Sequence, residues 1–149
     1  MMNNISDRLK EIGLLSLNRR NAEYILAHNP RRLYPLVDDK YRTKKIALKA
    51  GLAVPDLYGV VNIEYQIRDL PVLLGPYRDF VIKPSRGSGG NGIMVISDRS
   101  KQMYRKIDGL LLNETELGYH VSNILSGMYS LGGQPDKALI EYRVKFNPL

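Results

Sequence analysis

A lysine followed by a glycine-rich loop is the feature of this sequence best suited to chemistry. Lys83 ends the apolar run 80–82, and residues 85–92 read Ser-Arg-Gly-Ser-Gly-Gly-Asn-Gly. Glycine has no Cβ and lets backbone N–H groups approach phosphate oxygens, while the lysine ammonium supplies a positive charge. The pattern therefore predicts a polyphosphate-binding loop, and a hairpin loop that binds nothing is the alternative.

Two well-known phosphate-binding patterns do not describe this loop. Gly87, Gly89 and Gly92 satisfy G-x-G-x-x-G, but that motif requires a helix directly after the glycines. Residues 93–96 are instead an apolar run typical of a strand. Lys83 precedes the glycines, whereas the lysine of G-x-x-x-x-G-K-[ST] follows them. The sequence therefore predicts a strand–loop–strand arrangement over residues 79–96.

Composition and charge limit the class of protein. The chain has 149 residues and 44% hydrophobic content, which suits one globular domain. The absence of cysteine excludes disulfides, thiolate metal sites and cysteine nucleophiles. With no signal-peptide pattern and no apolar run of about 18 residues, we expect a cytoplasmic protein that does not bind membranes. Of the net charge of +7, residues 1–51 carry +6, which predicts an anionic partner.

Helices and strands alternate along the chain. Residues 6–28 have a helical pattern with a break near Gly13, and residues 31–37 are predicted to be an extended connector. A helix over 38–50 begins at an aspartate cap and stops at Gly51. We further predict strands over 58–63, 102–106, 110–112 and 138–144, helices over 64–74 and 113–128, and a loop over 130–136. The alternation argues for an α+β or α/β domain.

A second lysine and a glutamate complete the set of candidate residues. Lys40 opens the helix over 38–50, 43 residues before Lys83, and Glu141 lies 58 residues after Lys83. Taken alone, Lys40 is typical of a solvated helix face, since other lysines occupy the same helix. Lys83 is harder to explain in this way, because a lysine at the end of an apolar strand needs a partner or a path to solvent.

The order and spacing of these elements resemble the ATP-grasp superfamily. The shared elements are Asp39-Lys40 at a helix start, Gly51-Leu-Ala-Val-Pro55 after that helix, and the strand Val81-Ile-Lys-Pro84 before the glycine loop. The nearest resemblance is to the glutamate-ligase-like, sugar-transfer-associated ATP-grasp group, and it covers nearly the whole chain. Residues 17–21, 29–40 and 120–130 are also similar to that group's sequence.

The resemblance implies a role for each matching residue. Lys40 and Lys83 match the two phosphate-binding lysines. Glu141 matches an acceptor for the adenine amino group, and the Tyr142 carbonyl and Val144 N–H match the groups that bind the purine edge. Residues that match the flap over the β- and γ-phosphates are Ser85, Gly87, Ser88, Gly89, Gly90 and Gly92.

The resemblance also implies a fold and a reaction. We expect an α+β fold in which a helical segment and connector, residues 1–37, precede a small, mostly antiparallel sheet with flanking helices. Residues 38–149 match the N-terminal ATP-grasp subdomain up to the adenine hinge. The implied activity is ATP-dependent joining of a small-molecule or peptide carboxylate to an amine through an acyl phosphate. ATP and Mg²⁺ are the expected cofactors, with the magnesium ligands beyond residue 149, so we expect the chain to be inactive alone.

Other expectations concern partners and alternative functions. Apolar surface that the missing half would cover favours a homo-oligomer. A nucleotide-binding or regulatory module without catalysis is the first alternative. A nucleic-acid-binding domain is the second, suggested by the basic N-terminal segment with Tyr24, Tyr34 and Tyr41, and it is disfavoured because no helix-turn-helix spacing is evident.

Overall fold

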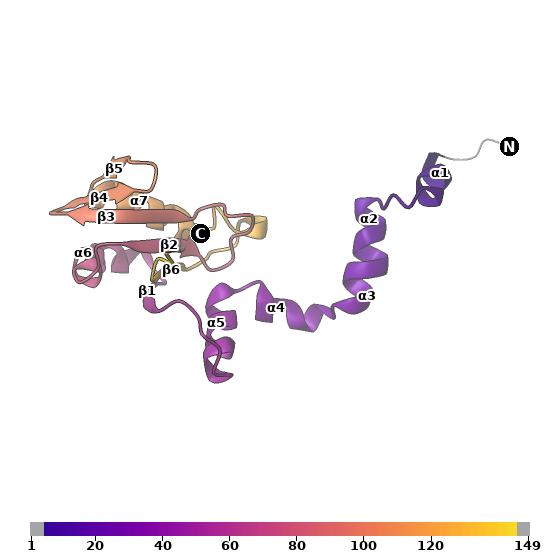
Figure 1. The fold of residues 1–149 in the computed structure, drawn as a ribbon, viewed down its shortest axis with the longest axis horizontal. Coiled ribbons are helices and arrows are strands. Elements are labelled where there is room, and N and C mark those ends of the chain that lie inside the picture. Colours follow the sequence, from indigo (N-terminus) through magenta and orange to yellow (C-terminus); the bar gives the residue numbers. More distant parts are fainter. Residues whose placement is uncertain (1–4, 146–149) are drawn as a thin grey trace. The chain divides into compact units, whose positions relative to one another are not determined.

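The computed structural model describes residues 5–145, and the chain divides into two compact units, residues 1–37 and 38–149 (Figure 1). The first unit consists of short helices. In chain order these are α1 (Ile5–Glu11), α2 (Leu17–Arg19), the π-helix η1 (Arg20–Ile25), α3 (Leu26–His28), the 3₁₀-helix η2 (Arg31–Leu33) and α4 (Tyr34–Val37).

The first unit confirms one local prediction and corrects another. The helical pattern is interrupted at Gly13, which has a φ of +78°, and Ser16 then caps α2. The extended connector predicted over 31–37 is wrong, because these residues form η2 and α4. Pro30 and Pro35 stand at the starts of these two helices, where the fixed φ of proline fits a first helical turn. None of the described side chains of the first unit is buried.

The second unit contains a six-stranded antiparallel sheet with strand order β1-β6-β2-β3-β4-β5. Its strands are β1 (Leu57–Val61), β2 (Phe80–Pro84), β3 (Met94–Ser100), β4 (Met103–Lys106), β5 (Leu111–Leu112) and β6 (Ala138–Glu141). Its helices are α5 (Lys40–Lys49), η3 (Glu64–Asp69), α6 (Leu70–Leu74), α7 (Glu114–Leu125) and η4 (Leu131–Gly133). The α+β fold with a mostly antiparallel sheet is therefore confirmed.

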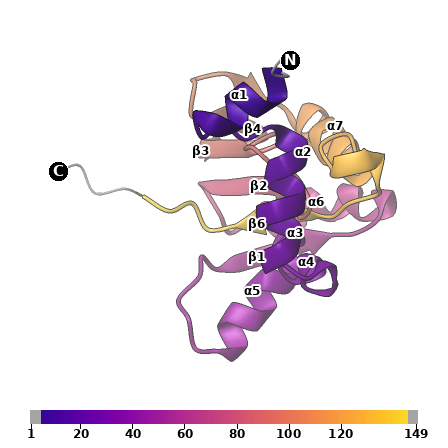
Figure 2. The same cartoon turned by 90° about the vertical axis from the view of Figure 1, so that its right-hand side faces the viewer.

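The hydrophobic core lies on the sheet face that α7 covers (Figure 2). Phe80 and Ile82 of β2 point into this core together with Val121 and Ile124 of α7. The predicted capping box of α7 is confirmed, with reciprocal hydrogen bonds between Asn113 and Glu116. Because side chains alternate along a strand, Lys83 belongs to the opposite face.

Several element boundaries differ from the prediction. The helix of residues 113–128 ends at Leu125, because Gly127 has a φ of +85° and turns the chain, and Met128 is 63% exposed. The last strand ends at Glu141 rather than at residue 144. The loop over 130–136 contains the short helix η4. No helix within residues 5–145 is both long enough and apolar enough to cross a membrane.

Candidate functional site

The start of α5 is hydrogen-bonded to the loop that follows β2. Asp39, the N-cap of α5, accepts from the Arg42 N–H at 3.1 Å and from the Ser85 hydroxyl at 2.6 Å. The carbonyl of the buried Ser85 accepts from the Lys40 N–H at 2.9 Å. Burial acts to raise the pKa of Asp39, but the Ser85 hydroxyl and the Arg42 N–H stabilise the carboxylate and leave its pKa below the usual value. The helix and the loop therefore hold one another in place.

Lys40 points into the glycine loop. Its ammonium donates to the Gly87 carbonyl and lies 3.5 Å from the Ser85 carbonyl oxygen. Burial lowers the pKa of Lys40, and the nearby charge of Lys83 lowers it further, while Asp136 and Asp39 act in the opposite direction. Lys40, from a distant part of the sequence, therefore reaches the loop that Lys83 and Pro84 precede.

Lys83 pairs with Glu141 across adjacent strands. In the register of β2 and β6, Val81 stands opposite Glu141 and Lys83 opposite Leu139, so the two charged side chains are diagonal neighbours on one sheet face. The Lys83 ammonium lies 2.5 Å from Glu141 Oε2. The carboxyl side chain of Glu141 is only 3% exposed, whereas Lys83 is 23% exposed.

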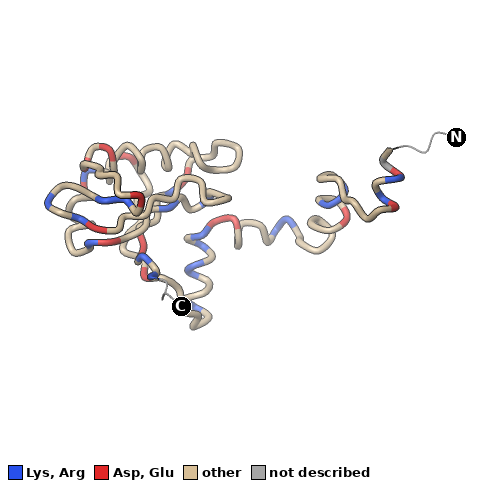
Figure 3. Tube along the Cα trace, turned by 45° about the horizontal axis from the view of Figure 1, so that its top comes forward, with Lys and Arg blue, Asp and Glu red and all other residues tan. Residues whose placement is uncertain are grey.

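A third lysine, which the sequence analysis did not select, also reaches Glu141. The Lys44 ammonium lies 3.0 Å from Glu141 Oε1 and donates to the Pro55 carbonyl. Its side chain is 6% exposed. The signal that points to Lys44 is its spacing of four from Lys40, which places both lysines on one face of α5. Figure 3 shows the Lys and Arg residues along this helix.

The first part of the loop is anchored by residues just before β6. Ser85 donates its N–H to the Lys137 carbonyl at 2.9 Å, and Arg86 donates its N–H to Asp136 at 2.8 Å. Gly87 forms an isolated antiparallel bridge with Ser130. A Cβ on Gly87 would lie 2.3 Å from the Pro84 ring, so this glycine is required by close packing.

The last part of the loop is anchored on α7 and the turn after it. His120 donates its Nε2–H to the Gly92 carbonyl at 3.0 Å, and a Cβ on Gly92 would lie 2.5 Å from the Tyr129 ring. Between the anchors, Gly89 and Gly90 have positive φ values of +62° and +80°, and a Cβ on either would meet only open space. The loop therefore has two fixed ends and an open glycine tip, an arrangement that can present backbone N–H groups to an anion.

The three predicted adenine-binding residues occupy different environments. Glu141 is enclosed by the two ammoniums, with Lys44 3.0 Å from its Oε1 and Lys83 2.5 Å from its Oε2. Tyr142 and Val144 are 40% and 49% exposed. Tyr142 donates its N–H to the Asp56 carbonyl at 2.8 Å, which leaves its own carbonyl as the group predicted to bind a purine. The roles of all three remain predictions.

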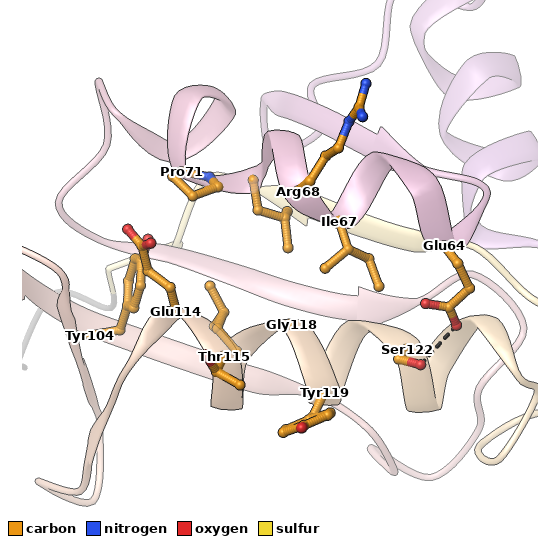
Figure 4. Close-up of a pocket in the computed structure, with 12 residues that line it drawn as sticks. Glu64, Ile67, Arg68, Pro71, Tyr104, Glu114, Thr115, Gly118, Tyr119 and Ser122 are labelled. Atoms are coloured by element: carbon orange, nitrogen blue, oxygen red, sulfur yellow. Dashed lines mark hydrogen bonds between the residues drawn. The ribbon is translucent and has the colours of Figure 1, made fainter.

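A separate pocket of ≈ 480 Å³ lies between η3, α6 and α7 (Figure 4). The Ser122 hydroxyl donates to Glu64 at 2.7 Å across one end of it. Its lining contains none of the residues singled out above; it comprises Glu64, Ile67, Arg68, Leu70, Pro71, Tyr104, Glu114, Thr115, Leu117, Gly118, Tyr119 and Ser122.

Acidic side chains at the loop already have partners. Asp39 accepts from Ser85, Asp136 accepts from Arg86, and Glu141 pairs with Lys83. Over residues 5–145 there is no group of three or more His, Asp or Glu side chains that could hold a metal ion.

Comparison with known proteins places this geometry in a family context. A family model described as sugar-transfer associated ATP-grasp matches residues 19–149, which include both lysines, the glycine loop and β6. No curated protein and no solved structure matches the chain.

Proposed function

This chain belongs to the sugar-transfer associated ATP-grasp family, and we propose that its loop 85–92 binds the phosphates of ATP between Lys40 and Lys83. The observation that carries the proposal is that both lysines adjoin the loop: the Lys40 ammonium donates to the Gly87 carbonyl, and Lys83 lies in β2 two residues before Ser85. In keeping with this arrangement, the charge of Lys83 lowers the pKa of Lys40. Bringing two like charges together costs free energy unless an anion offsets them. A triphosphate between them removes that repulsion.

The loop itself contributes to the proposed phosphate site. Its ends are fixed by Asp136 and His120, while Gly89 and Gly90 leave the tip free of side-chain bulk. Backbone N–H groups at such a tip bind phosphate oxygens directly, and the Ser88 hydroxyl adds a donor from the same turn. Fixed ends reduce the conformational entropy that ordering the loop on a ligand would cost.

We propose that the purine binds beside β6. The Tyr142 carbonyl would accept from the adenine amino group and the Val144 N–H would donate to the ring. A carboxylate oxygen has two lone pairs, so Glu141 Oε1, which lies 3.0 Å from the Lys44 ammonium, would still accept a hydrogen bond from the amino group. Its ion pairs with the lysines would then stabilise the carboxylate that accepts this bond.

The proposed reaction joins a carboxylate to an amine. The substrate carboxylate oxygen attacks the γ-phosphorus of ATP, which forms an acyl phosphate and releases ADP. The amine nitrogen then attacks the acyl carbon, loses a proton and expels inorganic phosphate. Lys40 and Lys83 would offset negative charge on the phosphates, and the loop would exclude water that hydrolyses the intermediate. None of these roles requires a metal ligand from the residues described.

Nucleotide binding tests the phosphate site. Isothermal titration should show that ATP binds the wild-type chain and that Lys40→Met and Lys83→Met each weaken binding by about tenfold or more. Lys49→Met is the matched control, because Lys49 is an exposed lysine on the same helix. If the wild-type protein does not bind ATP, or if both lysine variants bind it as well as Lys49→Met does, the proposal is wrong.

Trapping the intermediate tests the reaction separately from binding. Hydroxylamine attacks acyl phosphates and leaves a stable hydroxamate, so formation of ADP and a hydroxamate from ATP, a carboxylate and hydroxylamine would show that the chain catalyses the first step. ATP binding without either product would agree both with the expectation that the chain is inactive alone and with the alternative of a nucleotide-binding module without catalysis.

A further inference from the structure

Three charged side chains form a cluster beneath the proposed phosphate site, and their charges do not cancel. Lys44 and Lys83 both contact Glu141, at 3.0 and 2.5 Å. The side chains of Lys44 and Glu141 are 6% and 3% exposed, so water screens their interaction weakly. With two ammoniums and one carboxylate, the cluster has a net charge of +1.

Lys83 is the member of the cluster that a ligand can reach. Its side chain is 23% exposed, and Lys83 is the last residue but one of β2, which leads directly into the glycine loop. Lys44 is enclosed, and its ammonium donates to the Pro55 carbonyl. The excess positive charge of the cluster is therefore available to an anion only through Lys83.

We infer that Lys44 is a positioning residue of the nucleotide site, which neutralises Glu141 so that Lys83 keeps a positive charge for phosphate. Without Lys44, Glu141 and Lys83 would form a neutral pair, and the carboxylate would hold the ammonium against β6. This inference rests on the proposed function, because it assigns Lys44 an effect on an anion that Lys83 binds. A purely structural role, in which Lys44 only joins α5 to β6, is the competing explanation.

Inorganic tripolyphosphate is the sharpest probe, because it carries the anionic charge without the adenine that Glu141 is proposed to contact. We expect Lys44→Met to weaken binding of tripolyphosphate and of ATP by about tenfold, through the loss of one positive charge. Adenosine affinity should not change. Lys49→Met again serves as the control, since it removes the same charge from an exposed position of α5.

Two double variants separate the charge effect from a structural one. In a Lys83→Met background, Lys44→Met should have no further effect on tripolyphosphate binding, because the residue through which it acts is gone. Lys44→Met with Glu141→Gln leaves Lys83 as the only charge of the cluster and should restore tripolyphosphate binding to the wild-type level. This second variant replaces a buried ion pair by neutral groups, a change that proteins often tolerate, so it keeps the test valid if Lys44→Met alone unfolds.

The outcomes distinguish this inference from the proposed function. If the wild-type chain binds neither ATP nor tripolyphosphate, both fail. If it binds them and Lys44→Met leaves the affinity unchanged, only the role of Lys44 is overturned. The same conclusion holds if Lys44→Met weakens adenosine equally, if its effect persists in full without Lys83, or if Glu141→Gln does not restore binding.

Discussion

The Ser85 hydroxyl donates a hydrogen bond to the Asp39 carboxylate at 2.6 Å. Asp39 is the N-cap residue of α5, and Ser85 is the first residue after β2, so this bond joins the helix that carries Lys40 to the strand that carries Lys83. This contact is one of several hydrogen bonds that join the start of α5 to the loop after β2, together with those from the Lys40 and Tyr41 N–H groups to Ser85.

Removing either partner of this bond should destabilise the second unit. We expect Asp39→Ala to lower the free energy of unfolding by about 1–2 kcal/mol, because α5 loses its cap. Ser85→Ala should cost a similar amount, since the part-buried carboxylate loses a donor. Urea denaturation measures both, and the double variant should cost less than the sum because the residues share one bond. Ser88→Ala, at an exposed position of the same loop, is the control, and an equal loss there would contradict the prediction.

Two glycines of the loop, one closely packed and one open to solvent, should lose different amounts of unfolding free energy when replaced by alanine. A Cβ at Gly87 would lie 2.3 Å from the buried Pro84 ring, so Gly87→Ala should cost about 2–3 kcal/mol of unfolding free energy. At Gly89 the Cβ has space, and the cost of about 1 kcal/mol comes from the positive φ alone. Chemical denaturation of the two variants checks the order. Equal costs would show that packing against Pro84 is relieved by a movement of the loop.

Local sequence patterns predicted the helices well, but they did not predict which strands pair in the sheet. Capping and periodicity identified α5 and α7, because Asp39, Asn113 and Glu116 act within one turn of their own helix. By contrast, β6 lies between β1 and β2 in the sheet and pairs with both. These strands are far apart in the sequence, and no local pattern specifies their pairing.

The same limit applies to the candidate site. Lys83 and its loop could be recognised because the strand, lysine and glycines are contiguous in sequence. Lys44 shares a helix face with Lys40, but its partner could not be predicted, because only the docking of α5 brings this lysine to Glu141. A nonlocal contact of this kind needs the tertiary structure.

The ammonium of Lys40 should titrate below the ordinary lysine value of 10.5. Burial is the main cause and the charge of Lys83 the second, so Lys83→Met should raise the pKa of Lys40 in part. Competitive labelling with acetic anhydride, read by mass spectrometry over a range of pH, gives the midpoint for this side chain. Bound ATP should raise it as well, since an anion favours the charged lysine. A midpoint that neither Lys83→Met nor ATP changes would contradict the proximity of the two lysines.

The burial of His120, the α7 residue that anchors the loop, should make stability depend on pH. Burial lowers the pKa of His120 below its usual 6.5, and the charge of Lys106 adds to this, against the opposing effect of the bond to the Gly92 carbonyl. The folded state therefore binds its proton less readily than the unfolded state. The contribution of neutral His120 to the free energy of unfolding is fully present above about pH 6.5, the unfolded-state pKa. It is lost progressively as the pH falls from there through the folded-state pKa.

A neutral side chain at this position should remove that dependence. His120→Gln keeps an amide N–H that can donate to Gly92, so we expect the change in unfolding free energy between pH 7.5 and pH 5 to be smaller than in the wild type. The exposed His28 provides the matched control, because His28→Gln removes the other histidine and should leave the pH dependence as it is. If both variants follow the wild-type curve, His120 does not control the stability of the loop.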